Sequence, residues 1–244
     1  MLILSQLKAL ERKKEEIELK GSIRSIIFGM QDGLISIVSL MAGIAGATDN
    51  KQIVIILTGI TAAIAGALSM GTGEYLSSKS EKEIFEYEKQ RAKNLIDKEP
   101  YIAQEGLLES LVKDGLSRDR AYKIVEQLSN EEKIFRSTFS EKVLGLGEAE
   151  ISQPVRAAIS ISLAFIIASL IPILPYFFFL GYLGVLYSIL ATSIALFIIG
   201  ILKGQFAGLN IWKSGFEFFL IAFTSAVVGY IIGDYIVGYF FQIQ

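Results

Sequence analysis

Residues 23–47 of the chain read IRSIIFGMQDGLISIVSLMAGIAGA. Arg24 and Asp32 are the only charged residues in this run. A helix that crosses a hydrocarbon core of about 30 Å needs roughly 20 predominantly apolar residues, because each residue advances about 1.5 Å along the helix axis. The run is therefore long and apolar enough to predict a transmembrane helix.

Four further windows have the same apolar character, and they cover approximately residues 53–76, 155–179, 181–202 and 216–241. Helices are expected because lipid offers no hydrogen-bond partner to an unpaired backbone group, and because the windows lack the alternation of barrel strands. The composition agrees, since 52% hydrophobic residues and a mean hydropathy of +0.50 exceed the values of ordinary soluble domains. The predicted fold class is an all-α membrane protein with five transmembrane helices.

The charged residues are separated from the apolar windows. Of the 48 charged residues (23 basic plus 25 acidic), 10 lie in residues 1–24 and 29 in residues 77–150, which leaves 9 for the rest of the chain. This segregation predicts four parts. They are a cytosolic N-terminal arm (1–22), transmembrane helices 1 and 2 (23–76), a cytosolic helical insert (77–152) and transmembrane helices 3 to 5 (153–244).

The insert has a helical pattern of its own. Apolar residues recur at helical spacing from Ser77 to Asp97, so the second membrane helix is expected to continue into the insert until Pro100 interrupts it. A second pattern ends at Gly115, and a third follows Ser117, an N-cap candidate. Three or four helices result. The 16 acidic and 13 basic residues of the insert nearly balance, so no nucleic-acid-binding surface is expected.

Basic residues in the short loops predict the orientation, because Lys and Arg tend to remain on the cytoplasmic side. The first loop has only Lys51 and the fourth has Lys203 and Lys213, whereas the N-terminal segment has six such residues, namely Lys8, Arg12, Lys13, Lys14, Lys20 and Arg24. We expect an integral multi-pass protein of a plasma or vacuolar membrane. Its N-terminus and insert would lie in the cytosol, and its C-terminus outside the cell or in a lumen.

The absence of Cys and His from the sequence excludes several kinds of chemistry. The chain has no thiolate or imidazole ligand, no disulfide, no Cys nucleophile and no His-based proton relay. It also has no recognisable nucleophile–base pair and no Gly-rich phosphate loop. We therefore expect no enzymatic activity, no catalytic residue and no permanently bound cofactor.

Charged residues inside transmembrane windows are expensive and tend to mark function. The acidic residues in these windows are Asp32, Glu74, Glu217 and Asp234, of which the last two lie nearer the ends of their window and suggest structural or proton-handling roles. Asp32 lies nine residues beyond Ile23, which places it about 14 Å into the membrane. A carboxylate at that depth must be protonated, paired, hydrated or bound to a cation.

The second window adds Gly66, Met70 and Glu74, which are spaced four apart and share one helix face. Carboxylates accept any divalent cation, but a thioether suits transition metals better than Mg²⁺ or Ca²⁺. Together with Asp32, these residues predict a two- or three-ligand site for an ion such as Fe²⁺ or Mn²⁺, and a dimer axis here would double the ligands. The structural alternative is that Met70 only packs, that Glu74 reaches the interface, and that the small residues serve helix packing.

Two stretches carry a family resemblance. Residues 24–34 read RSIIFGMQDGL and residues 65–77 read AGALSMGTGEYLS, and together they resemble the vacuolar iron transporter family of Fe²⁺ and Mn²⁺ exporters. The likeness extends from about residue 21 onward, through Ile171 to Tyr176, Gly200 to Gly204, and the pair Gly229 and Gly233.

The resemblance implies a five-span homodimer whose pore follows the subunit interface and which exports divalent iron or manganese from the cytosol in exchange for protons. Asp32 matches the family's pore aspartate, Met70 its pore methionine, and Glu74 the glutamate of its Gly-Glu-Tyr motif. The insert matches a helical domain that in some members collects metal through glutamates and methionines. Glu105 and Glu109 lie near that pattern and share one predicted helix face, but the insert contains no methionine.

The chain departs from the family pattern at two membrane positions. Ala62 stands where some members have a further glutamate, and Ser25 stands where an acidic residue follows the basic one. The alternative function is a regulatory or receptor-like membrane protein whose cytosolic domain senses a ligand, although Asp32 argues against it. The expected partners are transition-metal ions, protons, membrane lipid and a second copy of the chain, with no nucleic acid.

Overall fold

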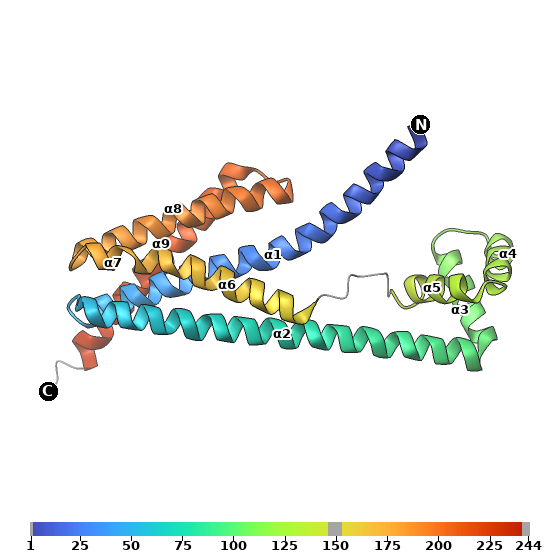
Figure 1. Cartoon of the computed structure of the whole chain (residues 1–244), viewed down its shortest axis with the longest axis horizontal. Coiled ribbons are helices and arrows are strands. Elements are labelled where there is room, and N and C mark those ends of the chain that lie inside the picture. The colour runs from blue at the N-terminus through green and yellow to red at the C-terminus, as the bar shows by residue number, and fades with distance from the viewer. Residues whose placement is uncertain (1, 146–152, 241–244) are drawn as a thin grey trace. The chain divides into compact units, whose positions relative to one another are not determined.

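The computed structural model describes the backbone of residues 2–145 and 153–240, and the surroundings of the side chains in residues 23–145 and 153–235 (Figure 1). All regular structure in these ranges is helical, which confirms the all-α prediction. The predicted end of the fifth span at Phe241, the C-terminus and the last residues of the predicted insert lie outside the described residues. The chain divides into two compact units, Met1–Tyr75 with Pro154–Gln244 (the membrane unit) and Leu76–Gln153 (the insert).

Five helical segments are long and apolar enough to cross a membrane, as predicted, within the part of the chain that the structure describes. The helices that contribute to them are α1 (Leu2–Ala47), α2 (Gln52–Lys98), α6 (Pro154–Ile173), α7 (Pro175–Phe178), α8 (Tyr182–Ala207) and α9 (Ile211–Phe240). α1 begins well before the apolar window, so the predicted N-terminal arm and the first span form one continuous helix.

The third span, Pro154–Phe178, agrees with the window predicted at residues 155 to 179, but its helical hydrogen-bond ladder is interrupted at Leu174. α6 ends at Ile173 and the short α7 begins at Pro175. Pro172 and Pro175 have no backbone N–H, so each removes one hydrogen bond from the helical ladder. The hydroxyl of Ser188 on α8 donates a hydrogen bond of 2.7 Å to the carbonyl of Pro172. A neighbouring helix therefore satisfies one of the carbonyls at the break.

α1 packs closely against α6 and α9 through glycines. A Cβ atom added at Gly29 would lie 2.9 Å from Ile161 of α6, and one added at Gly33 would lie 2.7 Å from the carbonyl oxygen of Phe165. Residue numbers thus rise together along α1 and α6, and these helices are parallel. At these two contacts any side chain larger than hydrogen would push α6 away, which explains the glycines.

The second half of α1 makes the same kind of contact with α9. A Cβ atom at Gly43 would lie 3.0 Å from the carbonyl oxygen of Gly229, and one at Gly46 would lie 2.8 Å from that of Tyr230. A Cβ atom at Gly233 would overlap the carbonyl of Gly43. α1 and α9 are therefore parallel, and their backbones touch along this seam.

α2 runs antiparallel to α1 and α6. Gly59 of α2 lies against the sulfur of Met41, whereas Gly66, further along the helix, lies against the ring of Phe165. α8 is in turn antiparallel to α9, because Gly200 lies against Ser214. These contacts fix the relative depth of the residues on different membrane helices.

The insert is built from the C-terminal part of α2 and from α3 (Pro100–Lys113), α4 (Arg118–Ser129) and α5 (Glu132–Lys142). As predicted, α2 gives way to a new helix at Pro100, whose ring suits a first helical turn. Gly115 follows α3 with a φ of 102°, a conformation that favours glycine. Ser117 occupies the N-cap position of α4, as predicted, but its side chain makes no capping hydrogen bond.

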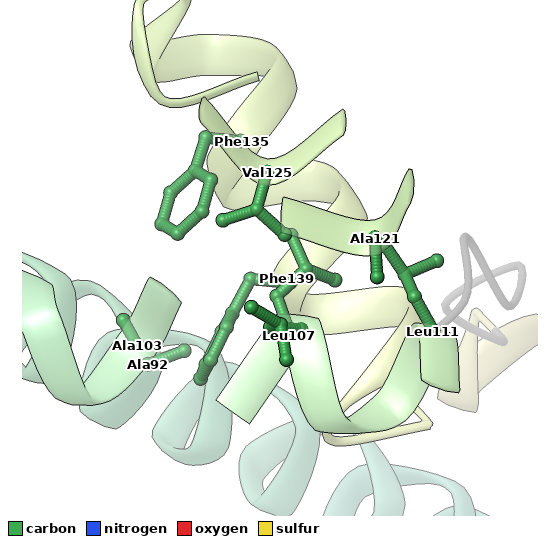
Figure 2. Packing of buried hydrophobic residues seen from close by; sticks show 9 residues of the cluster. Ala92, Ala103, Leu107, Leu111, Ala121, Val125, Phe135 and Phe139 are labelled. Carbon is green, nitrogen blue, oxygen red and sulfur yellow. The ribbon is translucent and has the colours of Figure 1, made fainter. Parts of the chain in front are cut away.

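The four helical segments of the insert enclose one hydrophobic core (Figure 2). The rings of Phe135 and Phe139, both on α5, stack with their centroids 6.2 Å apart. The core residues are Ala92, Ala103, Leu107, Leu108, Leu111, Ala121, Val125, Phe135 and Phe139. Because this core is complete without the membrane helices, the insert has its own source of stability.

Candidate functional site

Asp32 lies on the side of α1 that the rest of the described chain leaves partly uncovered. Its neighbour Gly33 is buried against α6, and a helix turns about 100° per residue, so Asp32 points away from that contact. Phe28 and Ser36, four residues to either side, are exposed on the same face. Within the described residues the Asp32 carboxylate has no hydrogen-bond or ion-pair partner, although its backbone carbonyl accepts a bond of 2.5 Å from the Ser36 hydroxyl.

Met70 and Glu74 lie on α2 with Gly66, in a row at the edge of the packed face. All three are partly buried. Ala67 is almost completely buried beside the row, whereas Ser69 on its other side is exposed. The row therefore borders the surface that this chain does not cover.

The glycine contacts give the depth of these residues in the membrane unit. Gly66 and Gly33 both contact Phe165, so Asp32 lies at about the depth of Gly66. Met70 and Glu74 follow one and two turns later, toward the end of the unit where α6 begins. The three predicted residues thus occupy successive depths in one half of the membrane unit.

One chain does not bring these residues into a closed metal site. No group of three Asp, Glu, His or Cys side chains that could hold a metal ion occurs among the described residues. The chain instead offers one thioether and two carboxylates along two helices, which is a row of candidate ligands rather than a complete coordination shell.

Glu217 and Asp234, the other acidic residues predicted in the membrane windows, do not join Asp32. Glu217 is exposed near the start of α9, and Asp234 is exposed near the other end of that helix. The backbone nitrogen of Asp234 lies 3.0 Å from the position of a Cβ atom on Gly46, at the far end of α1 from Arg24. Neither residue therefore adds a ligand at the depth and on the face of Asp32.

Glu105 and Glu109, the predicted ligands of the insert, share one face of α3 and pair with Arg118 of α4. The Nη1 atom of Arg118 donates a hydrogen bond of 2.6 Å to Glu109, and its Nη2 atom donates one to Glu105. These interactions, with Glu109 contributing most, raise the pKa of Arg118 above its ordinary value. The sequence pattern did not reveal this arginine, since its role depends on how α4 packs against α3.

Five apolar helices, one of which carries a carboxylate at mid-depth without a partner in the described chain, define a multi-pass membrane protein with a candidate ion-binding position. The model of the VIT family matches residues 23–234. The chain belongs to this family, as the resemblance of the two membrane motifs predicted.

Named relatives agree with this assignment. A vacuolar iron transporter of Centaurea cyanus is 33% identical over 201 residues, which are 82% of each chain. Vacuolar iron transporter 1 of Arabidopsis thaliana is 32% identical, over 84% of this chain and 81% of the relative. Protein CCC1 of Saccharomyces cerevisiae is 29% identical, over 74% of this chain and 56% of the relative. Two of the three are named as transporters and none as an enzyme, in agreement with the expectation of no catalysis.

Proposed function

We propose that this protein exports Fe²⁺ or Mn²⁺ from the cytosol in exchange for protons. The main support is Asp32, a carboxylate about 14 Å into an apolar helix, for which the described chain supplies no partner. Relatives named vacuolar iron transporters support the class of cargo. In this role Asp32 is occupied alternately by a metal ion and by a proton.

The exchange follows from competition for the same oxygens. A metal binds the ionised carboxylate, so protons arriving from the opposite side of the membrane displace it and reset the site. Met70 lies about one turn from the depth of Asp32, where its thioether favours transition metals over Mg²⁺. Glu74, a further turn along, receives the ion first from the cytosol.

Asp32, Met70 and Glu74 of one chain form an incomplete set of candidate ligands, which supports a dimer with the pathway at its interface. Two carboxylates and one sulfur from each chain become four carboxylates and two sulfurs when two copies face each other. The uncovered face of α2 carries the small hydroxyl residues Thr61, Ser69 and Thr72 between apolar ones. The hydroxyls of Thr61 and Thr72 each bond a carbonyl of their own helix at 2.8 Å, so this face suits close helix–helix contact.

The helix register supports a cytosolic N-terminus. Because Gly29 lies beside Ile161 in parallel helices, Arg24 and Arg156 lie at the same end of the membrane unit. Lys203, in the last part of α8, and Lys213, at the start of α9, lie at that end as well, since α9 runs parallel to α1 and α8 antiparallel to it. Lys51 lies at the other end. The end with Arg24 thus has four of these basic residues and the end with Lys51 has one, which favours the end with Arg24 as the cytoplasmic one.

The decisive experiment is metal flux into proteoliposomes under an acid-inside gradient. Asp32→Asn keeps the size of the side chain but removes the charge that binds metal, so we expect it to abolish the flux of Fe²⁺ and Mn²⁺. Asp119→Asn, on the exposed surface of the insert, is the control and should transport normally. Normal flux in Asp32→Asn would remove the central role assigned to this carboxylate.

Met70→Leu tests selectivity in the same assay. Leucine keeps an apolar side chain of similar volume but cannot coordinate a metal, so we expect part of the Mn²⁺ flux to remain while excess Mg²⁺ inhibits it more strongly. The measurement is Mn²⁺ uptake at increasing Mg²⁺ concentration. An unchanged inhibition curve would mean that Met70 only packs.

A further inference from the structure

Thr192 of α8 has a buried hydroxyl group with no hydrogen-bond partner among the described residues. The residue is 0% exposed. A threonine hydroxyl in a helix can bond the carbonyl four residues earlier, as those of Thr61, Thr72 and Thr224 do here at 2.8, 2.8 and 2.6 Å. The hydroxyl of Thr192 makes no such bond to the carbonyl of Ser188. A partner for it therefore has to lie outside its own helix.

The neighbouring helix α6 has a carbonyl group that lacks its usual helical donor. Pro172 has no backbone N–H, so it cannot donate to the carbonyl of Ala168, four residues earlier. Ala168 is completely buried, and so is Ser169 beside it. A buried carbonyl without a donor is strongly unfavourable inside a membrane, where lipid offers no replacement. This carbonyl also needs a partner outside its own helix.

The packing of the helices brings Thr192 to the level of Ala168. α8 runs antiparallel to α6, because α6 and α9 both run parallel to α1 and α8 runs antiparallel to α9. The Ser188 hydroxyl bonds the carbonyl of Pro172. Thr192 follows Ser188 by about one turn of α8, and Ala168 precedes that proline by about one turn of α6. Leu196, a further turn along α8, belongs to the same hydrophobic cluster as Ala168.

A water molecule can join these groups, which do not bond each other directly. An internal water makes about three hydrogen bonds to buried polar groups. Three such groups meet here, namely the Thr192 hydroxyl, the Ala168 carbonyl and the Ser169 hydroxyl. The last of these donates a bond of 2.7 Å to the carbonyl of Phe165, and its oxygen can still accept one. Ala168 and Ser169 are small, and α6 contains no glycine that would draw its backbone against α8.

We propose that the membrane unit binds an internal water molecule between α6 and α8, held by the Thr192 hydroxyl, the Ala168 carbonyl and the Ser169 hydroxyl. The water replaces the hydrogen bond that Pro172 removes from α6. Ser169 lies against Gly33, so this site is on the Gly33 face of α1 and not on the face that carries Asp32. It is separate from the proposed ion pathway, and the inference does not rest on the proposed function.

Thr192→Val tests whether the hydroxyl has a partner, because valine has nearly the same shape but cannot form a hydrogen bond. If the hydroxyl binds the water, its removal leaves buried polar groups with one partner fewer. The thermal unfolding midpoint of the full chain in detergent should then fall by roughly 2–6 °C. If the hydroxyl has no partner, its removal relieves the cost of burying it. An unchanged or higher midpoint would overturn the proposal.

Ser193 supplies the matched control. Its side chain is 1% exposed and its hydroxyl also has no partner among the described residues. It lies two turns before Gly200, on the face of α8 that packs against α9. α9 contains no proline, so no carbonyl of that helix has lost its donor in this way. Ser193→Ala should leave the midpoint unchanged or raise it, and a fall as large as that of Thr192→Val would contradict the role given to the α6 carbonyl.

Solid-state NMR of the unaltered protein in lipid bilayers detects the water itself, so this measurement does not depend on the stability of the valine variant. In protein with ¹³C-labelled threonine, the Thr192 signal is identified by its loss in Thr192→Ser. Magnetisation from water should reach Thr192 although the residue is completely buried. Absence of this transfer would show that the site is dry and would overturn the proposal. None of these measurements involves metal flux, so the proposed transport function stands or falls separately.

Discussion

At the scale of single residues, the glycines of α1 and α9 decide how near two membrane helices can come. Among the glycines whose surroundings the structure describes, Gly233 has the tightest, since any Cβ atom there would overlap the backbone carbonyl of Gly43. A backbone carbonyl cannot rotate away as a side chain can. The position is therefore closed to every other residue unless the two helices separate.

We expect Gly233→Ala to destabilise the protein by about 1–3 kcal/mol, as overpacking does in other tightly packed interiors. The measurement is the thermal unfolding midpoint in detergent. Gly106→Ala is the control, because its Cβ atom would meet Phe139 and Val143 at 3.7 and 3.9 Å, which are ordinary contacts. Alanine in the interior of a helix is favoured over glycine by roughly 0.5–1 kcal/mol, so this control should be neutral or stabilising. An unchanged midpoint for Gly233→Ala would mean that the seam is looser than described.

At the scale of elements, the insert depends on a core that all four of its helical segments share. Phe139 is 1% exposed and lies at the centre of that core (Figure 2). Phe139→Ala should cost about 3–5 kcal/mol, because it removes a buried ring and leaves a cavity. Limited proteolysis should then cut within α3 to α5, whereas Tyr101→Ala, at a highly exposed position, should leave the digestion pattern unchanged. Resistance of Phe139→Ala to proteolysis would contradict a single shared core.

The sequence predicted the elements best where local chemistry determines them. Pro100 and Gly115 indicate helix boundaries. Pro100 has no backbone N–H, and Gly115 tolerates a positive φ. The interruption of the hydrogen-bond ladder at Leu174 was not predicted, because hydropathy alone does not reveal it, although Pro172 and Pro175 mark the place in the sequence. Arg118 was missed for a different reason, since pairing between α3 and α4 is a tertiary contact. Asp32, Met70 and Glu74 can be picked out from the sequence as candidate ligands, but their relative depth came only from the helix contacts.

At the scale of the whole molecule, the orientation of the membrane unit can be tested directly, because the chain contains no cysteine. Single cysteines can be introduced without removing native ones. In cells that carry the protein in their plasma membrane, we expect Lys51→Cys to react with a membrane-impermeant maleimide added to intact cells, and Lys213→Cys to react only after the membrane is permeabilised. The two positions lie at opposite ends of the membrane unit by the helix register. Labelling in the reverse pattern would invert the orientation and with it the direction of export.

The glycines of the membrane helices make two kinds of contact, one with backbone atoms and one with side-chain atoms. Along α1 and α9, backbone faces backbone, and no adjustment of side chains can relieve a displacement. Gly59, Gly66 and Gly71 of α2 instead face side chains, namely the sulfur of Met41, the ring of Phe165 and the hydroxyl of Ser162, and that hydroxyl donates a hydrogen bond of 3.0 Å to the carbonyl of Ala67 on α2. Asp32 thus lies on a helix whose backbone packs directly against another backbone, whereas Met70 and Glu74 lie on a helix whose glycines pack mainly against side chains. If the pathway opens alternately to the two sides of the membrane, we expect α2 to move more than α1 does.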